Sequence, residues 1–178
     1  MSSDDVEKSL VVIGLIFGSI ILASLFSPWM KLSSSPYRAE NKNLTTQDTT
    51  TITGYDLMVG KYKVKRRNFS TEEVLQVKEL KGPSKFYTLL VLVGGLLILS
   101  GGIIGLYPRR RLALILMTVG SILAFTGAFW CIIDTHWIRL RSISFGSYAF
   151  FGYWRYGLIV ILGGSLSCSI GTIISTKV

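Results

Sequence analysis

The chain has 178 residues, a hydrophobic fraction of 49% and a formal net charge of +9. The hydrophobic residues gather in four uncharged runs, and the segments between the runs have ordinary polarity, which excludes a separate soluble domain with a core of its own. Both cysteines, Cys131 and Cys168, fall inside apolar runs, which excludes a disulfide that staples the longest segment between the runs. Buried structural thiols are the interpretation that we favour for them.

The four apolar runs organise the chain. Each run holds 19 to 22 residues, and a helix that rises about 1.5 Å per residue needs roughly 20 residues to cross a ~30 Å hydrocarbon layer. The sequence therefore predicts a single, mainly α-helical membrane domain in which four spans form a left-handed bundle. The predicted spans and loops are span 9–27, outer loop 28–85, span 86–107, inner turn 108–111, span 112–133, outer loop 134–155 and span 156–176.

Charge leaves two topologies open for these spans. The compact cationic turn at residues 107–111 is typical of the cytoplasmic side, whereas more Lys and Arg lie near the helix ends on the side of the long loop. Acceptor sequons at Asn43 and Asn68 favour an outer location for that loop and make both residues glycosylation candidates. We therefore expect a multi-pass plasma-membrane protein with cytoplasmic termini and the large first loop outside.

Glycines recur at helical spacing in every run. Lipid offers no hydrophobic drive for helix association, so close approach of backbones along small residues supplies the packing. Spacings of seven residues favour a left-handed bundle with small crossing angles, and general glycine enrichment in membrane helices is the competing interpretation. The helix-packing candidates are Gly14, Gly18, Gly94, Gly101, Gly105, Gly120, Gly127, Gly157, Gly164 and Gly171.

The first outer loop has patterns of regular structure. The Thr-rich segment 49–57 and the strict alternation of residues 61–65 predict two strands, which a turn at 58–60 joins into a small β-hairpin. Ser70 and Glu73 have capping-box spacing, which predicts a short amphipathic helix ahead of the second span.

The same loop carries the candidate interaction residues. The basic run 61–67 is typical of a patch for an anionic partner, such as a glycan or a lipid headgroup, and a solvated strand face is the alternative. With the loop outside the cell, nucleic acid is not an expected partner. The outer-loop interaction candidates are Trp29, Tyr55, Lys61, Lys63, Lys65, Arg66 and Arg67.

None of the four runs contains Asp, Glu, Lys, Arg or His. Proton relays and coupled transport nearly always need an ionisable group within the bilayer, so the sequence predicts neither an enzyme nor a pump, and no cofactor. Cys131, Asp134 and His136 supply three types of metal ligand within six residues. Their spacing matches no standard zinc pattern, and no metal is expected there.

Trp29 directly after the first run and Gly54-Tyr55-Asp56-Leu57 in the first loop, together with the tight second turn and the smaller third loop, resemble the claudin-like tetraspan architecture. The resemblance covers the whole chain and is mainly topological. Proteins of the claudin type carry a Trp, then Gly-Leu-Trp and a pair of Cys in the first loop; both Cys are missing here, so tight-junction function is not implied. The same residues also resemble small prokaryotic or archaeal four-span proteins of unknown function.

These patterns predict a non-enzymatic four-span membrane protein that acts as a structural, interaction or accessory subunit. It would work through lateral helix packing and its basic outer loop, as a homo-oligomer or within a larger membrane complex. The alternative is a channel or transporter component whose outer mouth uses residues 61–67 for anion selectivity. A metalloenzyme that uses the outward-facing His136 comes third.

Overall fold

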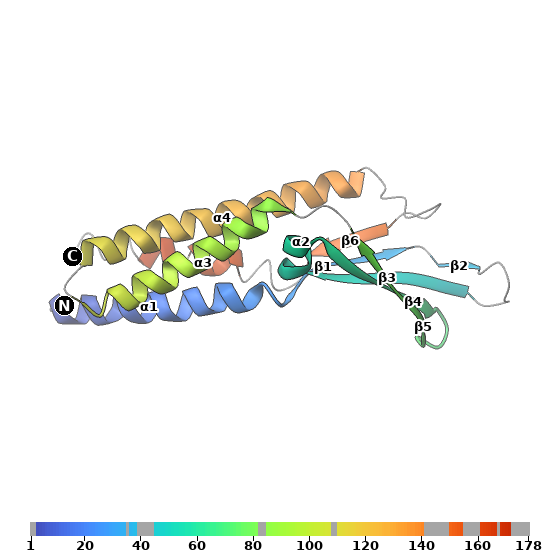
Figure 1. Cartoon of the computed structure of the whole chain (residues 1–178), viewed down its shortest axis with the longest axis horizontal. Coiled ribbons are helices and arrows are strands. Elements are labelled where there is room, and N and C mark those ends of the chain that lie inside the picture. The colour runs from blue at the N-terminus through green and yellow to red at the C-terminus, as the bar shows by residue number, and fades with distance from the viewer. Residues whose placement is uncertain are drawn as a thin grey trace.

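The computed structural model describes residues 3–34, 36–38, 45–81, 85–107, 110–140, 150–154, 161–166 and 168–171. The molecule is elongated, with helices gathered at one end and strands at the other (Figure 1). In chain order the elements are α1 (Ser3–Ser24), β1 (Pro28–Ser34), β2 (Tyr37–Arg38), β3 (Thr45–Thr53), α2 (Gly54–Val59), β4 (Lys61–Asn68), β5 (Val74–Lys81), α3 (Phe86–Ile104), α4 (Arg110–Leu140) and β6 (Phe150–Trp154), followed by a shorter apolar helix, Ile161–Gly171.

Two helices in the described part of the chain are long and apolar enough to cross a membrane. They are α3 itself, Phe86–Ile104, and the segment Arg111–Asp134 of α4. The first and fourth predicted spans correspond to the shorter apolar helices Val11–Ser24 and Ile161–Gly171. The predicted four-span bundle with a small hairpin domain is therefore wrong.

The first helix ends at Ser24, before the predicted span 9–27 does, because the chain must turn into the sheet. The amide of Leu25 donates to the carbonyl of Leu22, and the amide of Phe26 donates to that of Ala23. These bonds span three residues and tighten the last turn of the helix. Two apolar residues of the predicted span thus lead into β1 instead.

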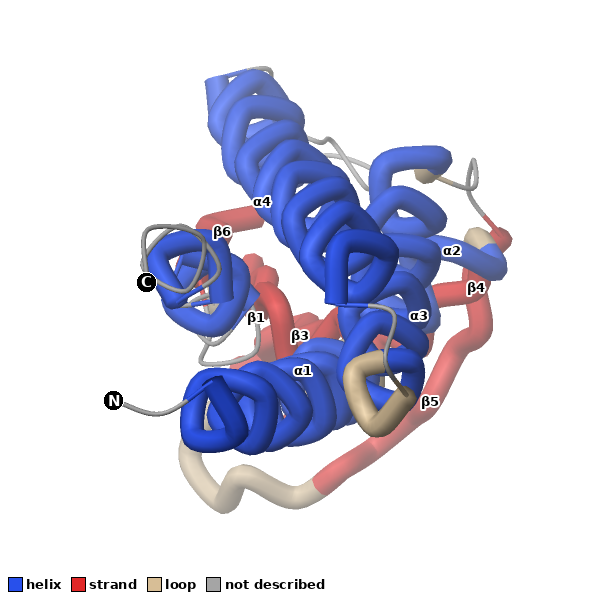
Figure 2. Tube along the Cα trace, turned by 90° about the vertical axis from the view of Figure 1, so that its left-hand side faces the viewer, coloured by secondary structure: helices blue, strands red, loops and turns tan. Residues whose placement is uncertain are grey.

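Glycines allow the long helices to touch. In the end-on view of Figure 2, α3 lies beside both α1 and α4. A Cβ atom placed on Gly14 of α1 would lie 2.5 Å from the Cα of Gly102 in α3, and one on Gly94 of α3 would lie 2.5 Å from the carbonyl oxygen of Gly120 in α4. Any side chain at these positions would push the helices apart, so the small residues set the helix spacing.

The first loop builds most of an antiparallel sheet with the strand order β5-β4-β3-β1-β6, and β2 also pairs with β3. The two predicted strands do pair, with Thr49 opposite Lys65. Their connection is the helix α2 rather than a tight turn: Thr53 and Asp56 form a capping box at its start, and Gly60, with φ 72°, ends it in the left-handed conformation. The hairpin is thus part of a larger sheet that β6 of the third loop completes.

The amphipathic helix predicted after Ser70 is wrong, because this segment forms the edge strand β5. The side chain of Asn68 accepts a bond from the amide of Ser70, and the amide of Asn68 donates to the carbonyl of Glu73. These bonds reverse the chain and return it alongside β4. A capping box at Ser70 would require a helix to begin there. The turn that the Asn68 side chain forms with the amide of Ser70 favours a different backbone conformation.

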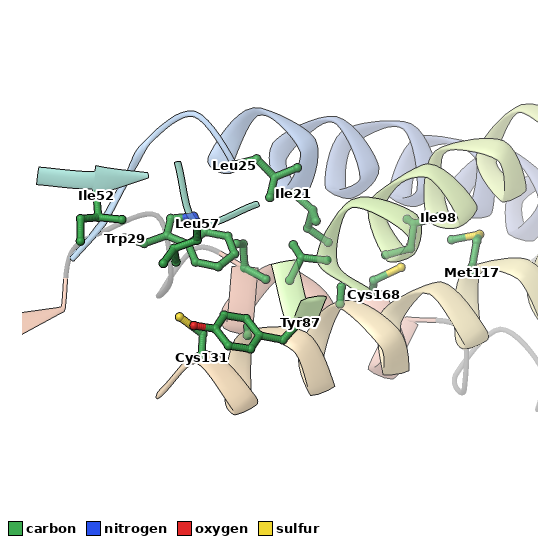
Figure 3. Packing of buried hydrophobic residues seen from close by; sticks show 14 residues of the cluster. Ile21, Leu25, Trp29, Ile52, Leu57, Tyr87, Ile98, Met117, Cys131 and Cys168 are labelled. Atoms are coloured by element: carbon green, nitrogen blue, oxygen red, sulfur yellow. The ribbon is translucent and has the colours of Figure 1, made fainter. Parts of the chain in front are cut away.

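The core is continuous from the helices into the sheet, and Trp29 lies at the junction (Figure 3). Its side chain is fully buried, and its indole Nε1 donates to the carbonyl oxygen of Ser24 over 2.9 Å. A Cβ atom on Gly54 would lie 2.6 Å from the indole ring, so α2 can pack directly on it. One aromatic side chain therefore joins α1, β1 and α2.

Candidate functional site

The charged side chains of β4 lie on both faces of the sheet. Successive side chains of a strand point to opposite faces, and β4 alternates strictly in exposure until Arg66. Lys61, Lys63 and Lys65 are exposed on one face, whereas Tyr62 and Val64 on the other are half-buried. The lysines thus form a row along one side of one strand.

Pairing extends this row across the sheet into a surface that we call the basic face. Lys65 lies opposite Thr49 and Arg67 lies opposite Gln47 on β3. On β1, Lys31 lies opposite Thr51. We define the basic face by the cations Lys31, Lys61, Lys63, Lys65 and Arg67. The register also places Arg38, opposite Thr45, and Lys81, opposite Lys61, on this face.

One acidic residue of the paired strands belongs to the basic face. Glu79 of β5 lies directly opposite Lys63, where opposite charges attract across the strands. Within the strands that the structure describes, the other acidic side chain is that of Asp48, and it lies on the opposite face. The basic face therefore keeps a net positive charge.

Arg66 differs from its neighbours in the basic run. It lies opposite Asp48, and its guanidinium donates twice to that carboxylate, from Nε to Oδ1 over 2.9 Å and from Nη2 to Oδ2 over 3.3 Å. A two-pronged pair of this kind matches the planar geometries of both groups. The predicted run of seven residues is thus divided, and Arg66 does not contribute to the basic face.

Two further interaction candidates from the first loop, Trp29 and Tyr55, lie outside the basic face. Trp29 is fully buried in the core and is not presented to a partner. Tyr55 is exposed on α2, where its ring stacks on Phe26 with centroids 5.7 Å apart. Of the two sequon residues, Asn68 is 8% exposed, with its side-chain oxygen bonded to the amide of Ser70, and Asn43 lies outside the described residues.

The packing glycines make their contacts within the chain. Gly164 lies against Phe17 and Gly171 against Ile13, both on α1, while Gly157 falls outside the described ranges. The remaining candidates lie against atoms of a neighbouring helix: Gly14, Gly18, Gly94, Gly101, Gly105, Gly120 and Gly127. A lateral partner would therefore meet other residues, on the outward helix faces.

A second polar feature, which we call the polar junction, lies where the helices meet the sheet. The Nζ of Lys85 lies 2.9 Å from Oδ2 of Asp134, and both side chains are 26% exposed. The hydroxyl of Tyr87 donates to the same oxygen over 3.0 Å, and the amide of Lys85 donates to the carbonyl of Leu57 in α2. The junction thus joins α2, α3 and α4.

The sequence contains a signal for the polar junction that the sequence analysis did not use. Lys85 immediately precedes one apolar run and Asp134 immediately follows another, so antiparallel helices bring their charges to the same level. Only the packing of α3 on α4 shows that they meet.

Two of the three residues considered as metal ligands, Cys131 and Asp134, lie at the polar junction. Cys131 is buried beside Tyr87 (Figure 3), and Asp134 already binds Lys85 and Tyr87. The side chain of His136 is outside the described part of the structure. Among the side chains that are described, no three His, Cys, Asp or Glu residues gather to hold a metal ion.

Tyr62 faces the polar junction from the sheet. Burial raises the pKa of its hydroxyl above the usual value of 10.0, and the carboxylates of Asp134 and Asp56 raise it further because they repel a phenolate. The hydroxyl therefore stays protonated and neutral over the physiological range. Chemically, the junction is a set of groups that neutralise one another, whereas the cations of the basic face outnumber the one acidic residue of the described strands that lies on it, Glu79.

Comparison of the chain with protein-family models and with curated proteins gave no match.

Proposed function

We propose that this chain is an integral membrane protein that holds a rigid sheet domain at the bilayer surface and acts, without catalysis, as an interaction or accessory subunit. The observation that carries the proposal is the apolar outer surface of the helices. Large aliphatic and aromatic side chains are exposed on α1, α3 and α4 at positions that no element in the described part of the chain covers. They are Val12, Ile16, Leu89, Leu96, Ile103, Ile115, Ile122 and Phe129, each 47% to 58% exposed.

Such a surface is unfavourable in water. Each Å² of apolar surface costs about 25 cal/mol when it contacts water, and soluble monomers rarely expose a continuous apolar patch larger than a few hundred Å². In a bilayer the same side chains contact lipid tails at no such cost, while all the backbone bonds of the helices remain satisfied. Lipid is therefore the solvent that suits these helices, with α3 and α4 as the spans.

Aromatic pairs at the sheet end of the helices support a boundary of the bilayer there. Phe26 stacks on Tyr55, and Phe86 meets Trp130 edge-on with centroids 6.1 Å apart. All four side chains are exposed. Aromatic residues of membrane proteins concentrate at the interface with water, so the sheet would lie in the aqueous phase directly above this belt.

The orientation of the chain is part of the proposal. Arg110 and Arg111 begin α4 at the end of the helices away from the sheet (Figure 1), and short cationic turns remain in the cytoplasm. The sheet would then face outward at the cell surface.

The outward helix faces, rather than the glycine seams, would serve lateral assembly. The glycines are already occupied within the chain, so a neighbouring subunit would pack on side chains such as Leu96 or Ile122. The alternative of an anion channel would use the same basic row around a pore between several copies, and no described contact favours it.

The proposal is tested by membrane extraction of the full chain. We expect the protein to stay in the pellet after alkaline carbonate washing and to be released by detergent. Ile122→Lys places a charge on the lipid-facing side of α4 and should reduce insertion several-fold, since a charge near the bilayer centre costs about 2.5–3.5 kcal/mol. The control Lys63→Gln changes a charge on the sheet and should insert normally. Recovery of the unmodified chain in the soluble fraction would contradict the proposal.

A further inference from the structure

The basic face has the geometry of a linear array. Side chains on the same face of a strand recur every two residues, about 6.6 Å apart, so the row from Lys61 to Arg67 is roughly 20 Å long. Lys61 directly follows α2, beside the helix ends, and β4 leads away from them toward the far end of the sheet (Figure 1). The row therefore starts at the proposed membrane surface and extends outward.

The charges in this row act together. The Debye length is about 8–10 Å at physiological ionic strength, which exceeds the spacing of about 6.6 Å between neighbouring lysines. Glu79 opposes Lys63, and Asp48 is engaged by Arg66 on the opposite face. A ligand that follows β4 would thus experience an almost uninterrupted positive potential.

The neighbouring strand supplies uncharged polar groups. Gln47, Thr49 and Thr51 lie on the same face as the lysines, according to their pairing partners. Their amide and hydroxyl groups can exchange hydrogen bonds with sugar hydroxyls. The register also places Tyr153 and Phe151 of β6 on this face, opposite Lys31 and Ser33, with β1 and β3 between them and the lysine row of β4.

A planar membrane surface suits the row poorly. The attraction of a headgroup layer falls off within a Debye length, about 8–10 Å, whereas the row extends roughly 20 Å outward. Headgroups would reach Lys61 and leave Lys65 and Arg67 unused. An extended chain with regularly spaced negative charges can contact the whole row.

We infer that the basic face binds a linear anionic polysaccharide, carboxylated or sulfated, that lies along β4 with its charges on Lys61, Lys63, Lys65 and Arg67. This inference deepens the proposed function and rests on it for the exposure of the sheet at the bilayer surface. The sheet then acts as the module that attaches the membrane protein to surface glycans. Glu79 limits the affinity because it partly neutralises Lys63.

The experiment measures binding of heparin-derived oligosaccharides of increasing length to the full chain in nanodiscs of neutral lipid. We expect affinity to rise with length until the oligosaccharide covers about 20 Å, the length of the row. The variant K61Q/K63Q/K65Q should bind roughly ten- to a hundred-fold more weakly, because each exposed charge contact contributes about two- to five-fold. Glu79→Gln should tighten binding about two-fold by the same reasoning.

Lys78→Gln is the matched control. Lys78 is an exposed lysine on the adjacent strand, opposite Val64 and therefore on the other face of the sheet. The variant Lys78→Gln removes one positive charge, as Lys63→Gln does, but leaves the row from Lys61 to Arg67 unchanged. Oligosaccharide binding should therefore change less than two-fold. Equal losses in Lys63→Gln and Lys78→Gln would show dependence on net charge alone and would overturn the inference.

Other outcomes separate the two proposals. Binding of wild type to vesicles that contain anionic lipid, with loss in the triple variant and no binding of the oligosaccharide, would overturn the glycan in favour of headgroups. A chain that inserts into nanodiscs but ignores the oligosaccharide overturns this inference and leaves the membrane proposal intact. A chain that fails to insert contradicts the membrane proposal itself.

Discussion

Lys85 and Asp134 join the start of α3 to the end of the apolar segment of α4 through an ion pair of 2.9 Å between Nζ and Oδ2. The hydroxyl of Tyr87 donates to the same carboxylate oxygen, and the amide of Lys85 holds the carbonyl of Leu57 in α2. The pair is partly shielded from water, so its electrostatic attraction is less screened than that of a surface pair. Together these contacts hold α2, which lies beside the sheet, against the ends of α3 and α4.

We predict that Asp134→Asn destabilises the protein by about 1–2 kcal/mol, between the values for exposed and buried ion pairs. The measurement is unfolding by SDS titration in mild detergent. A double-mutant cycle with Lys85→Gln should give a coupling energy of about 1 kcal/mol, since the two groups contact directly. Strictly additive effects of the two substitutions would show that the pair contributes nothing.

Tyr62 makes stability depend on alkaline pH. Its folded-state pKa is raised above 10.0, mainly by burial and then by Asp134 and Asp56, so the folded state holds the proton more tightly than the unfolded state does. The resulting stability is fully present below the unfolded pKa of about 10 and is lost as pH rises through the folded pKa.

We therefore expect the unfolding free energy of wild type to decrease more steeply between pH 9.5 and 11 than that of Tyr62→Phe, with those pH limits chosen around a model tyrosine pKa of about 10. Subtracting the two curves removes the titration of the other tyrosines and lysines. Parallel curves for both proteins would contradict the assignment.

Gly94 and Gly163 should respond in opposite directions to the same substitution. A Cβ atom on Gly94 would lie 2.5 Å from the carbonyl oxygen of Gly120, whereas one on Gly163 has no described neighbour within 4 Å. Gly94→Ala should cost about 1–3 kcal/mol because α3 and α4 must separate. Gly163→Ala should be neutral or stabilising by up to about 1 kcal/mol, because alanine favours the helix. SDS unfolding of both variants measures the difference, and similar losses at the two sites would contradict the seam between α3 and α4.

Trp29 should be far more sensitive to substitution than Trp130. Trp29→Phe leaves a void against Gly54 and removes the donor to the carbonyl of Ser24, which together should cost about 2–4 kcal/mol. Trp130→Phe, at a half-exposed position on α4, should cost less than about 1 kcal/mol. Thermal unfolding in detergent compares them. If Trp29→Phe were as stable as Trp130→Phe, the junction would not depend on the indole.

Local patterns predicted the elements whose signal lies within a short stretch of chain. The apolar runs form helices over most of their described residues, although the apolar helix of the first run is shorter than predicted, and residues 49–53 and 61–65 became paired strands. Glycine spacing predicted close helix contacts, and Gly14 and Gly94 lie against backbone atoms of a neighbouring helix; side-chain volume at a helix face depends on the sequence alone.

Nonlocal pairing determined the elements that the patterns missed. Residues 74–81 carry apolar side chains at spacings that suit either a helix or a strand, and pairing with β4 makes them a strand. The third loop supplies β6, whose partner β1 is more than a hundred residues away in sequence. No window of local sequence contains such a partner.

The sequence by itself determined that the four runs are apolar, uncharged and rich in small residues, since those properties belong to single segments. Tertiary structure alone decided which charges cooperate. In sequence, the run 61–67 forms one basic patch. In the strand, alternate side chains point to opposite faces, so Arg66 pairs with Asp48 on one face, and the other face carries the row of Lys61, Lys63 and Lys65. Likewise, Lys85 and Asp134 meet only because α3 packs antiparallel to α4. Charge and distance together determine an electrostatic site, and distance between remote residues is a property of the fold.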